Sequence, residues 1–339
     1  MSADPRHGAA ESRVGPRAAA WVRGDWLTDE FKAPFVAGES NVPLSYGLYV
    51  PSSVPSSTPS SPNSNARKAL PLVVMLHGCG QSAAAFARGT RMNVLADEHQ
   101  FAVLYPEQSD QRHPHACWQW YDPSPLSGGA EARAILALVD HVVAQHGFDS
   151  TRLYVAGLSA GAGMATLLAV RYPERFAAMA AHSGMVFGEA RSVMSGLDAM
   201  RRGTKNDPAA LASSVLDGQD HPGMPALLIH GTADDVVNPV NLGQLEAQFL
   251  QLNGLLDEAG GLRKSHVKES QHETAVKRDY FRDGRCVVRT YQVADLGHAW
   301  SGGDDSVPFH ASHGPEASRE IWAFFQAQRR LPLAVEATA

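Results

Sequence analysis

One stretch decides the fold expected of this chain: Leu153-Tyr154-Val155-Ala156-Gly157-Leu158-Ser159-Ala160-Gly161-Ala162-Gly163. Its first four residues are rich in branched and aromatic side chains and predict a buried strand, and residues 164–172 follow with helical spacing. Because Gly157 and Gly161 stand two residues before and after Ser159, the turn between strand and helix can be sharp and strained, with the serine lifted clear of the sheet. The five letters alone favour an ordinary Gly/Ser turn, but the flanking strand and helix favour a reactive serine.

The composition predicts a soluble globular protein with a large core. The chain has 339 residues, of which 44% are hydrophobic and 19% charged, and we expect one domain over residues 25–330 with tails at 1–24 and 331–339. A net charge of −6 offers no basic surface, so a nucleic-acid partner is not expected. Since no apolar run approaches the roughly 20 residues of a membrane span, we expect no membrane association.

Strands and helices alternate along most of the chain. This alternation predicts an α/β fold, with a mostly parallel, doubly wound sheet and helices on both faces. An edge strand is expected at 42–50. Further strands are expected at 70–76, 101–105, 153–156, 176–181, 225–229 and 286–293, and helices at 82–97, 130–146, 164–172, 242–252 and 318–328.

Two segments interrupt the alternation. Residues 52–68 are rich in Pro and Ser, a composition that cannot bury a core, and we expect a long loop between two strands. Residues 184–222 contain helical fragments with Ala and Met, which predict either a small cap over the site or a surface excursion.

A serine nucleophile needs a base and an acid that orients the base, and in doubly wound folds these follow the serine in the order acid, histidine, each after the end of a strand. Asp234 lies four residues beyond His230, directly after the strand expected at 225–229, and is the preferred acid. The alternatives are Asp235, expected to face solvent or cap the helix that begins near Pro239, and Asp295.

Fifteen histidines are present, so position has to select the base. His298 follows the last expected strand and precedes a Gly-rich loop, which allows its Nε2 to face the serine and its Nδ1–H the acid. His77 and His230 each precede a glycine at a strand end and are expected to hold loop geometry. His113 and His115 are expected to be solvated loop residues, and no metal site is predicted.

The negative charge of a tetrahedral intermediate requires two hydrogen-bond donors. Ala160 N–H, at the start of the helix after the serine, is one candidate. The loop after the strand at 70–76 normally supplies the other, which indicates the backbone N–H of Cys79.

Five motifs in order resemble the polyhydroxybutyrate depolymerase esterase family of α/β-hydrolases, which includes feruloyl and acetylxylan esterases. The resemblance covers about residues 40–330. It implies Ser159, Asp234 and His298 as a catalytic triad, the Cys79 and Ala160 N–H groups as oxyanion donors, and no cofactor. The motifs are His77-Gly78-Cys79-Gly80-Gln81, Cys117-Trp118-Gln119-Trp120-Tyr121, Gly157-Leu158-Ser159-Ala160-Gly161, His230-Gly231-Thr232-Ala233-Asp234 and Gly297-His298-Ala299-Trp300.

The resemblance also implies that Trp118, Trp120 and Trp300 border an acyl-ester cleft, the alternative being that they are core aromatics. Within this resemblance Cys79 and Cys117 are candidates for a disulfide. The family is often secreted, yet no signal peptide is visible at the N-terminus, so a cytoplasmic location with two free thiols is the alternative.

The resemblance predicts a serine esterase acting on hydroxyalkanoate oligomers or polymers. Only residues 331–339 follow the last helix, and we therefore expect action on soluble or amorphous esters rather than crystalline granules. A feruloyl or acetylxylan esterase is the first alternative, and a non-catalytic binding protein on the same fold is the second. The oligomeric state is left open.

Overall fold

A computed structural model describes residues 23–33, 43–52, 69–121, 129–215, 221–257, 259–262 and 267–330. The strands are β1 (Asp25–Phe31), β2 (Leu44–Val50), β3 (Leu72–Leu76), β4 (Ala102–Glu107), β5 (Leu153–Leu158), β6 (Ala178–His182), β7 (Ala226–Gly231), β8 (Val267–His272), β9 (Ala275–Arg282) and β10 (Arg285–Val293). The helices are α1 (Ala83–Thr90), α2 (Met92–His99), α3 (Gly129–His146), α4 (Ala160–Arg171), α5 (Val193–Arg202), α6 (Pro208–Val215), α7 (Val240–Leu252) and α8 (Ala317–Phe325).

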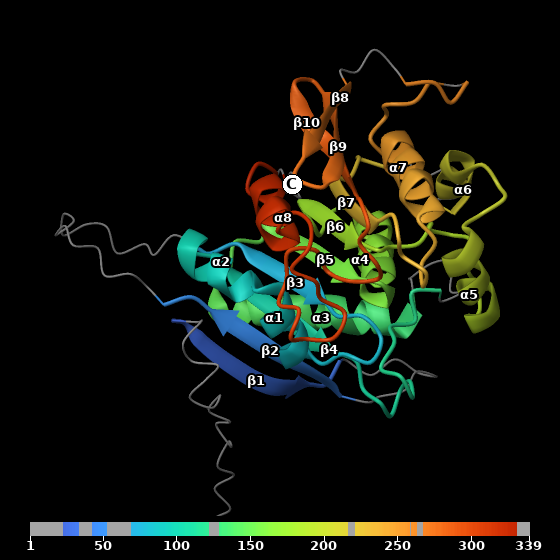
Figure 1. Cartoon of the computed structure of the whole chain (residues 1–339). Helices are drawn as coiled ribbons and strands as arrows, with labels where there is room; N and C mark the ends of the chain where they lie inside the picture. The colour runs from blue at the N-terminus through green and yellow to red at the C-terminus, as the bar shows by residue number, and fades with distance from the viewer. Residues whose placement is uncertain are drawn as a thin grey trace, which may run out of the picture.

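The strands of the described residues form a single ten-stranded sheet in the order β1-β2-β4-β3-β5-β6-β7-β10-β9-β8 (Figure 1). Its middle, from β4 to β10, is parallel. Antiparallel pairs close both ends. The mostly parallel sheet that the sequence predicts is therefore confirmed, and the carboxyl ends of its central strands meet at one edge.

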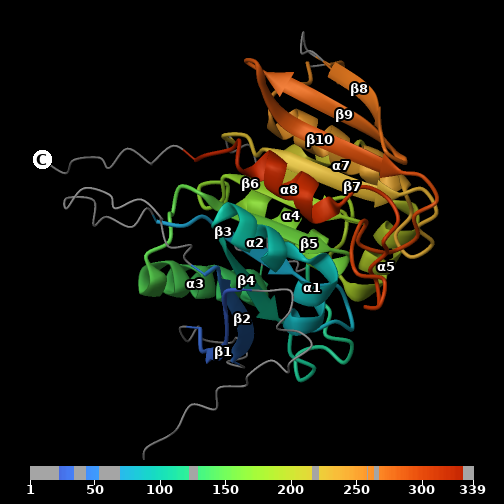
Figure 2. The same cartoon turned by 60° about the vertical axis from the view of Figure 1, so that its left-hand side comes forward.

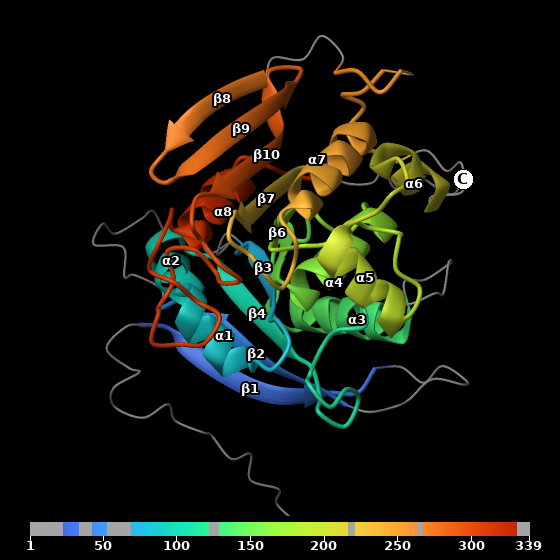
Figure 3. The same cartoon turned by 45° about the vertical axis from the view of Figure 1, so that its right-hand side comes forward.

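Each face of the sheet has its own hydrophobic core. In β3, Leu72, Val74 and Leu76 point into the core beneath α3, α4 and α7, while Val73 and Met75 point into the core beneath α1, α2 and α8. Figure 2 looks onto the side of α1, α2 and α8, and Figure 3 shows α3, α4 and α7 on the opposite side. This alternation explains the unbroken apolar run, because a strand that is covered on both faces has no polar side.

Several sequence predictions need correction near the N-terminal half. β2 is not an edge strand, because β1 pairs with it on its outer side. The helix expected at 82–97 is two helices, α1 and α2, separated at Arg91, whose backbone is left-handed with φ 56°. Residues 1–22, 53–68 and 331–339, which make up all of the predicted C-terminal tail and most of the predicted N-terminal tail (1–24) and Pro/Ser-rich loop (52–68), lie outside the described residues.

The described residues of the segment 184–222, which are 184–215 and 221–222, contain α5 and α6, and these helices lie beside α7 (Figure 1). Three amide side chains on one face of α7 form hydrogen bonds with the backbone of the segment that contains α5 and α6. Asn241 accepts from Val186 N–H, Gln248 exchanges two hydrogen bonds with Phe187, and Gln244 exchanges two with Thr204. None of the helices in the described part of the chain combines the length and apolarity that crossing a bilayer requires.

Candidate active site

Ser159 occupies a strained turn between β5 and α4. Its φ of 57° and ψ of −122° lie in a region that residues with a side chain rarely adopt. A Cβ atom at Gly157 would come within 2.3 Å of the Gly161 backbone, and one at Gly161 within 2.1 Å of Leu76 O. The prediction that both positions must lack a side chain is confirmed, and the turn is packed directly against the end of β3.

Asp234 and His298 are in direct contact. Asp234 follows the end of β7 and His298 follows the end of β10, its parallel neighbour, so the two loops leave the sheet side by side. His298 Nδ1 lies 2.9 Å from Asp234 Oδ2 and 3.1 Å from Oδ1. Because an ionised carboxylate only accepts hydrogen bonds, Nδ1 carries the proton and Nε2 is left to accept one.

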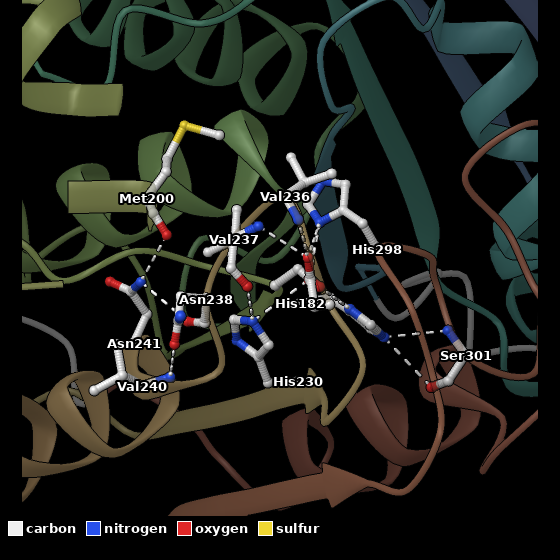
Figure 4. A network of polar contacts seen from close by, with 12 residues as sticks. His182, Met200, His230, Val236, Val237, Asn238, Val240, Asn241, His298 and Ser301 are labelled. Carbon is white, nitrogen blue, oxygen red and sulfur yellow. Dashed lines mark hydrogen bonds and ion pairs between the residues drawn. The ribbon is translucent and has the colours of Figure 1, made fainter. Parts of the chain in front are cut away.

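The Asp234 carboxylate is buried and surrounded by donors. Oδ1 accepts hydrogen bonds from Val236 N–H at 3.1 Å and Val237 N–H at 2.8 Å, and His230 Nε2 lies 3.4 Å from Oδ2. Figure 4 shows His298, His230, Val236 and Val237 close to one another, in agreement with their shared contacts to Asp234. Burial alone would raise the pKa of Asp234, but the hydrogen bonds from His230, His298 and Val237 outweigh it and hold that pKa well below its usual range.

The other two candidate acids are not placed for this role. Asp235 and Asp295 are both exposed, whereas Asp234 is 4% exposed. His230, whose Nε2–H also donates to Val237 O at 2.9 Å, holds the loop that carries Asp234, as the sequence predicts.

His182, at the end of β6, links the serine turn to the loop of His298. Its carbonyl accepts from Ser159 N–H at 3.0 Å, and its Nε2 accepts from Ser301 N–H at 3.1 Å (Figure 4). Burial lowers the pKa of His182 well below its usual value, which keeps the imidazole neutral and able to accept. Sequence reasoning missed this residue, although its position at a strand end parallels that of His77 and His230.

Ser159 and His298 therefore lie at the same edge of the sheet, on the loops that His182 joins. Within the described residues no hydrogen bond connects Ser159 Oγ to His298 Nε2. Such contacts are often long in enzymes without substrate and shorten in the reacting complex.

The two backbone N–H groups that are expected to bind an oxyanion, those of Cys79 and Ala160, lie near Ser159. A Cβ atom at Gly78 would lie 3.4 Å from the Cβ atom of Ser159, so the loop after β3 abuts the serine. In that loop Gly78 N–H donates to Gln81 Oε1 and Gly80 N–H to His115 O. In the described part of the chain, neither Cys79 N–H nor Ala160 N–H has an acceptor, which leaves both free for a ligand.

Two further contacts fix the loop after β3. Cys79 and Cys117 form a disulfide, in agreement with the pairing that the family resemblance suggested. His77 donates from Nδ1 to Gly78 O at 2.8 Å and accepts from Gln108 N–H at Nε2. Burial lowers the pKa of His77 to about 4, so it stays neutral at physiological pH.

The tryptophans divide into two groups. Trp118 and Trp300 are 1% and 0% exposed, and their indole N–H groups bond to His77 O and Ser318 Oγ. The expectation that these two border a cleft is wrong, because both rings are sealed inside the cores. Trp120 is partly exposed and packs over Gly163, on the first turn of α4, so it stays a candidate for substrate contact.

The described residues contain no group of three or more His, Cys, Asp or Glu side chains placed to hold a metal ion. His113 and His115 face each other with ring centroids 6.1 Å apart. His113 Nδ1 accepts from the backbone N–H groups of His115 and Cys117. Its contacts thus serve the disulfide-bonded loop.

The strand order, the strained serine and the chain order serine, aspartate, histidine define an α/β-hydrolase fold. Within that class the sequence is more specific. Residues 44–273 match the family described as "Esterase PHB depolymerase", and the chain belongs to this family.

Known proteins agree with this assignment. Poly(3-hydroxyalkanoate) depolymerase C of Paucimonas lemoignei is 34% identical over 238 residues, which cover 67% of this chain and 54% of that protein. Feruloyl esterase B of Neurospora crassa is 34% identical over 180 residues, covering 50% of this chain and 60% of that protein. The chain thus spans little more than half the length of these relatives.

A solved structure confirms the fold. The acetyl xylan esterase from Aspergillus awamori superposes with a TM-score of 0.64 at 19% identity, and the match covers 89% of this chain and 99% of that one. At this level of identity the likeness concerns the fold alone.

Proposed function

We propose that the protein is a serine carboxylic-ester hydrolase that cleaves hydroxyalkanoate oligomers or polymers, or related esters, through an acyl-enzyme intermediate. The observation that carries this proposal is the contact between His298 Nδ1 and the ionised Asp234, beside the strained turn of Ser159. This arrangement leaves His298 Nε2 without a proton, and in the proposed mechanism this nitrogen is the base for Ser159.

In the first half-reaction, Ser159 Oγ attacks the ester carbonyl carbon while its proton passes to His298 Nε2. The carbonyl oxygen becomes an oxyanion that the N–H groups of Cys79 and Ala160 bind. One such donor is worth about 3 kcal/mol of transition-state stabilisation. The intermediate then expels the alcohol oxygen, which takes the proton from Nε2 and leaves the acyl group on Ser159.

In the second half-reaction, water gives a proton to His298 Nε2 and attacks the acyl carbon. Collapse releases the carboxylic acid and returns the proton to Ser159 Oγ. Throughout, Asp234 keeps its charge and orients the imidazolium, which its depressed pKa favours.

A feruloyl or acetylxylan esterase is the second candidate, because relatives with those names match 35% to 63% of the chain. Kinetics on 3-hydroxybutyrate oligomers, hydroxycinnamate esters and acetylated xylan oligosaccharides separate the two candidates. Faster cleavage of the hydroxycinnamate or acetyl esters would replace the hydroxyalkanoate assignment.

The decisive experiment for the proposed chemistry is covalent labelling. A fluorophosphonate reacts with an activated serine, so we expect one phosphonyl group per chain at Ser159 and none in Ser159→Ala. A folded wild-type protein that takes no label would favour the remaining alternative, a non-catalytic protein on this fold.

A further inference from the structure

Phe309 is the third residue of a β-turn, which the backbone N–H of His310 closes on Val307 O at 3.2 Å, a position where glycine or asparagine is usual. Its backbone is left-handed, with φ 64°, a conformation that is strained for a bulky residue. Its side chain is also 45% exposed, so the ring gains little from burial. Both features act against stability, which suggests that the ring serves another purpose at this position.

The backbone of residues 308–309 is hydrogen-bonded both to the loop of the proposed base and to the loop of Cys79, one of the two proposed oxyanion donors. Trp300, two residues after His298, donates its backbone N–H to Phe309 O at 2.9 Å. On the other side, Gln81 Nε2 donates to Pro308 O at 3.4 Å. The Gln81 side chain also accepts from Gly78 N–H, in the loop that abuts Ser159. Phe309 is therefore tied to both sides of the candidate site.

The residue after Phe309 is firmly fixed. His310 is 6% exposed, and its ring lies so close to Gly89 that a Cβ atom there would come within 2.2 Å of it. The His310 ring also packs against Phe86, with centroids 5.9 Å apart. The backbone that carries the exposed Phe309 ring is therefore held in place, which a specific contact requires.

We propose that Phe309 is a specificity-determining residue that contacts the apolar alcohol part of the ester. This inference rests on the proposed function. His298 must deliver its proton to the leaving oxygen, so the alcohol part lies on the side of the His298 loop. Phe309 is bound to that same loop through Trp300.

The test compares two esters that share an acyl group, benzyl and methyl 3-hydroxybutyrate, with hydrolysis followed by titration of the released acid. Phe309→Gly removes the ring and also relieves the strain, since glycine adopts positive φ freely. We expect kcat/KM to fall about tenfold on the benzyl ester and to change less than about twofold on the methyl ester. The Tm should equal or exceed that of the wild type.

Two further variants separate the ring from the backbone. Phe309→Ala should give the same kinetic change with a lower Tm than Phe309→Gly, because alanine keeps the strain. Leu27→Ala is the matched control, since Leu27 is also 45% exposed but lies on the outer strand β1. We expect no change in its ratio of the two kcat/KM values.

Equal losses on both esters, or no loss on either, would overturn the inference while leaving the proposed function standing. A wild-type protein that cleaves neither ester and takes no fluorophosphonate at Ser159 would overturn both. The two failures are therefore distinguishable in one set of measurements.

Discussion

The tightest packing at the site is that of Gly161 against the end of β3, and Gly161→Ala tests it. The added Cβ atom would lie 2.1 Å from Leu76 O and 2.5 Å from His77 O. Backbone atoms in ordinary contact stay more than 3 Å apart, so helix α4 and strand β3 would have to separate by about 1 Å. Neither partner is a flexible side chain that could rotate away.

The magnitude follows from what such a shift disturbs. Overpacking a core costs about 1 to 3 kcal/mol, and more where backbone must move, so we expect Gly161→Ala to lower the free energy of unfolding by about 3 kcal/mol. The shift also separates Ser159 from the loop that carries Cys79 N–H. A displacement of about 1 Å costs roughly a hundredfold in rate, and kcat should fall by at least that factor.

Urea unfolding and ester hydrolysis together measure both effects. Gly243→Ala is the control, because Gly243 lies on the exposed side of α7 with no atom within 4 Å of its added Cβ. In a helix interior alanine is favoured over glycine by about 1 kcal/mol, so this variant should be more stable and equally active. A Gly161→Ala protein with wild-type stability and kcat would refute the close packing of the turn.

Two side chains give the remaining predictions. Asp234→Asn should lower kcat by about 10³ to 10⁴ with the fold intact, because the amide favours the wrong His298 tautomer. Circular dichroism checks the fold and ester hydrolysis measures kcat. A kcat within about tenfold of the wild type would argue against Asp234 as the acid. Burial raises the pKa of Asp149, but hydrogen bonds from Thr151 and Arg152 hold it at about 2, below an unfolded value near 3.9. Asp149 thus stabilises the fold above pH ~4 and loses that effect as the pH falls to 2. Asp149→Asn should cost about 1 to 2 kcal/mol at pH 7 and little at pH 2, as measured by urea unfolding at both values; an equal loss at both would contradict the assignment.

The parallel half of the fold could be predicted because its strands are buried on both faces. Such strands read as continuous apolar runs, and β3, β5 and β7 appear within a few residues of their expected limits. The site followed from the same strands, since Ser159, Asp234 and His298 each come shortly after a strand end. The position along the chain, rather than the residue type, selected His298 among fifteen histidines.

The antiparallel edges could not be predicted in the same way. β1 has the sequence DWLTDEF, is largely exposed and shows no clear alternation, so neither periodicity nor burial reveals it. The hairpin of β9 and β10, in contrast, carries a turn signal in its sequence. Asp283 and Gly284 both have positive φ, as the Asp-Gly pair of a tight hairpin turn requires.

Which side chains are exposed could not be predicted from the sequence either. Trp118 and Trp300 lie in motifs that also contain or adjoin functional residues, yet both are buried, while Phe309 lies in no motif and is exposed. A sequence pattern places a residue along a strand or loop, but its exposure depends on the helices and loops that pack over it. The same motif can therefore hold a residue that supports the site and one that reaches substrate.

Buried histidines form hydrogen bonds with the three loops of the candidate site at the edge of the sheet. A buried histidine stands at the end of each of three strands: His77 directly follows β3, His182 is the last residue of β6, and His230 is the last but one of β7. His77 bonds the loop of the oxyanion donor, His182 the loop of the base, and His230 the loop of the acid. An imidazole can donate at one nitrogen and accept at the other, so one side chain satisfies backbone groups that a strand end leaves unpaired. We infer that these hydrogen bonds help to hold the three loops of the candidate site in place relative to one another.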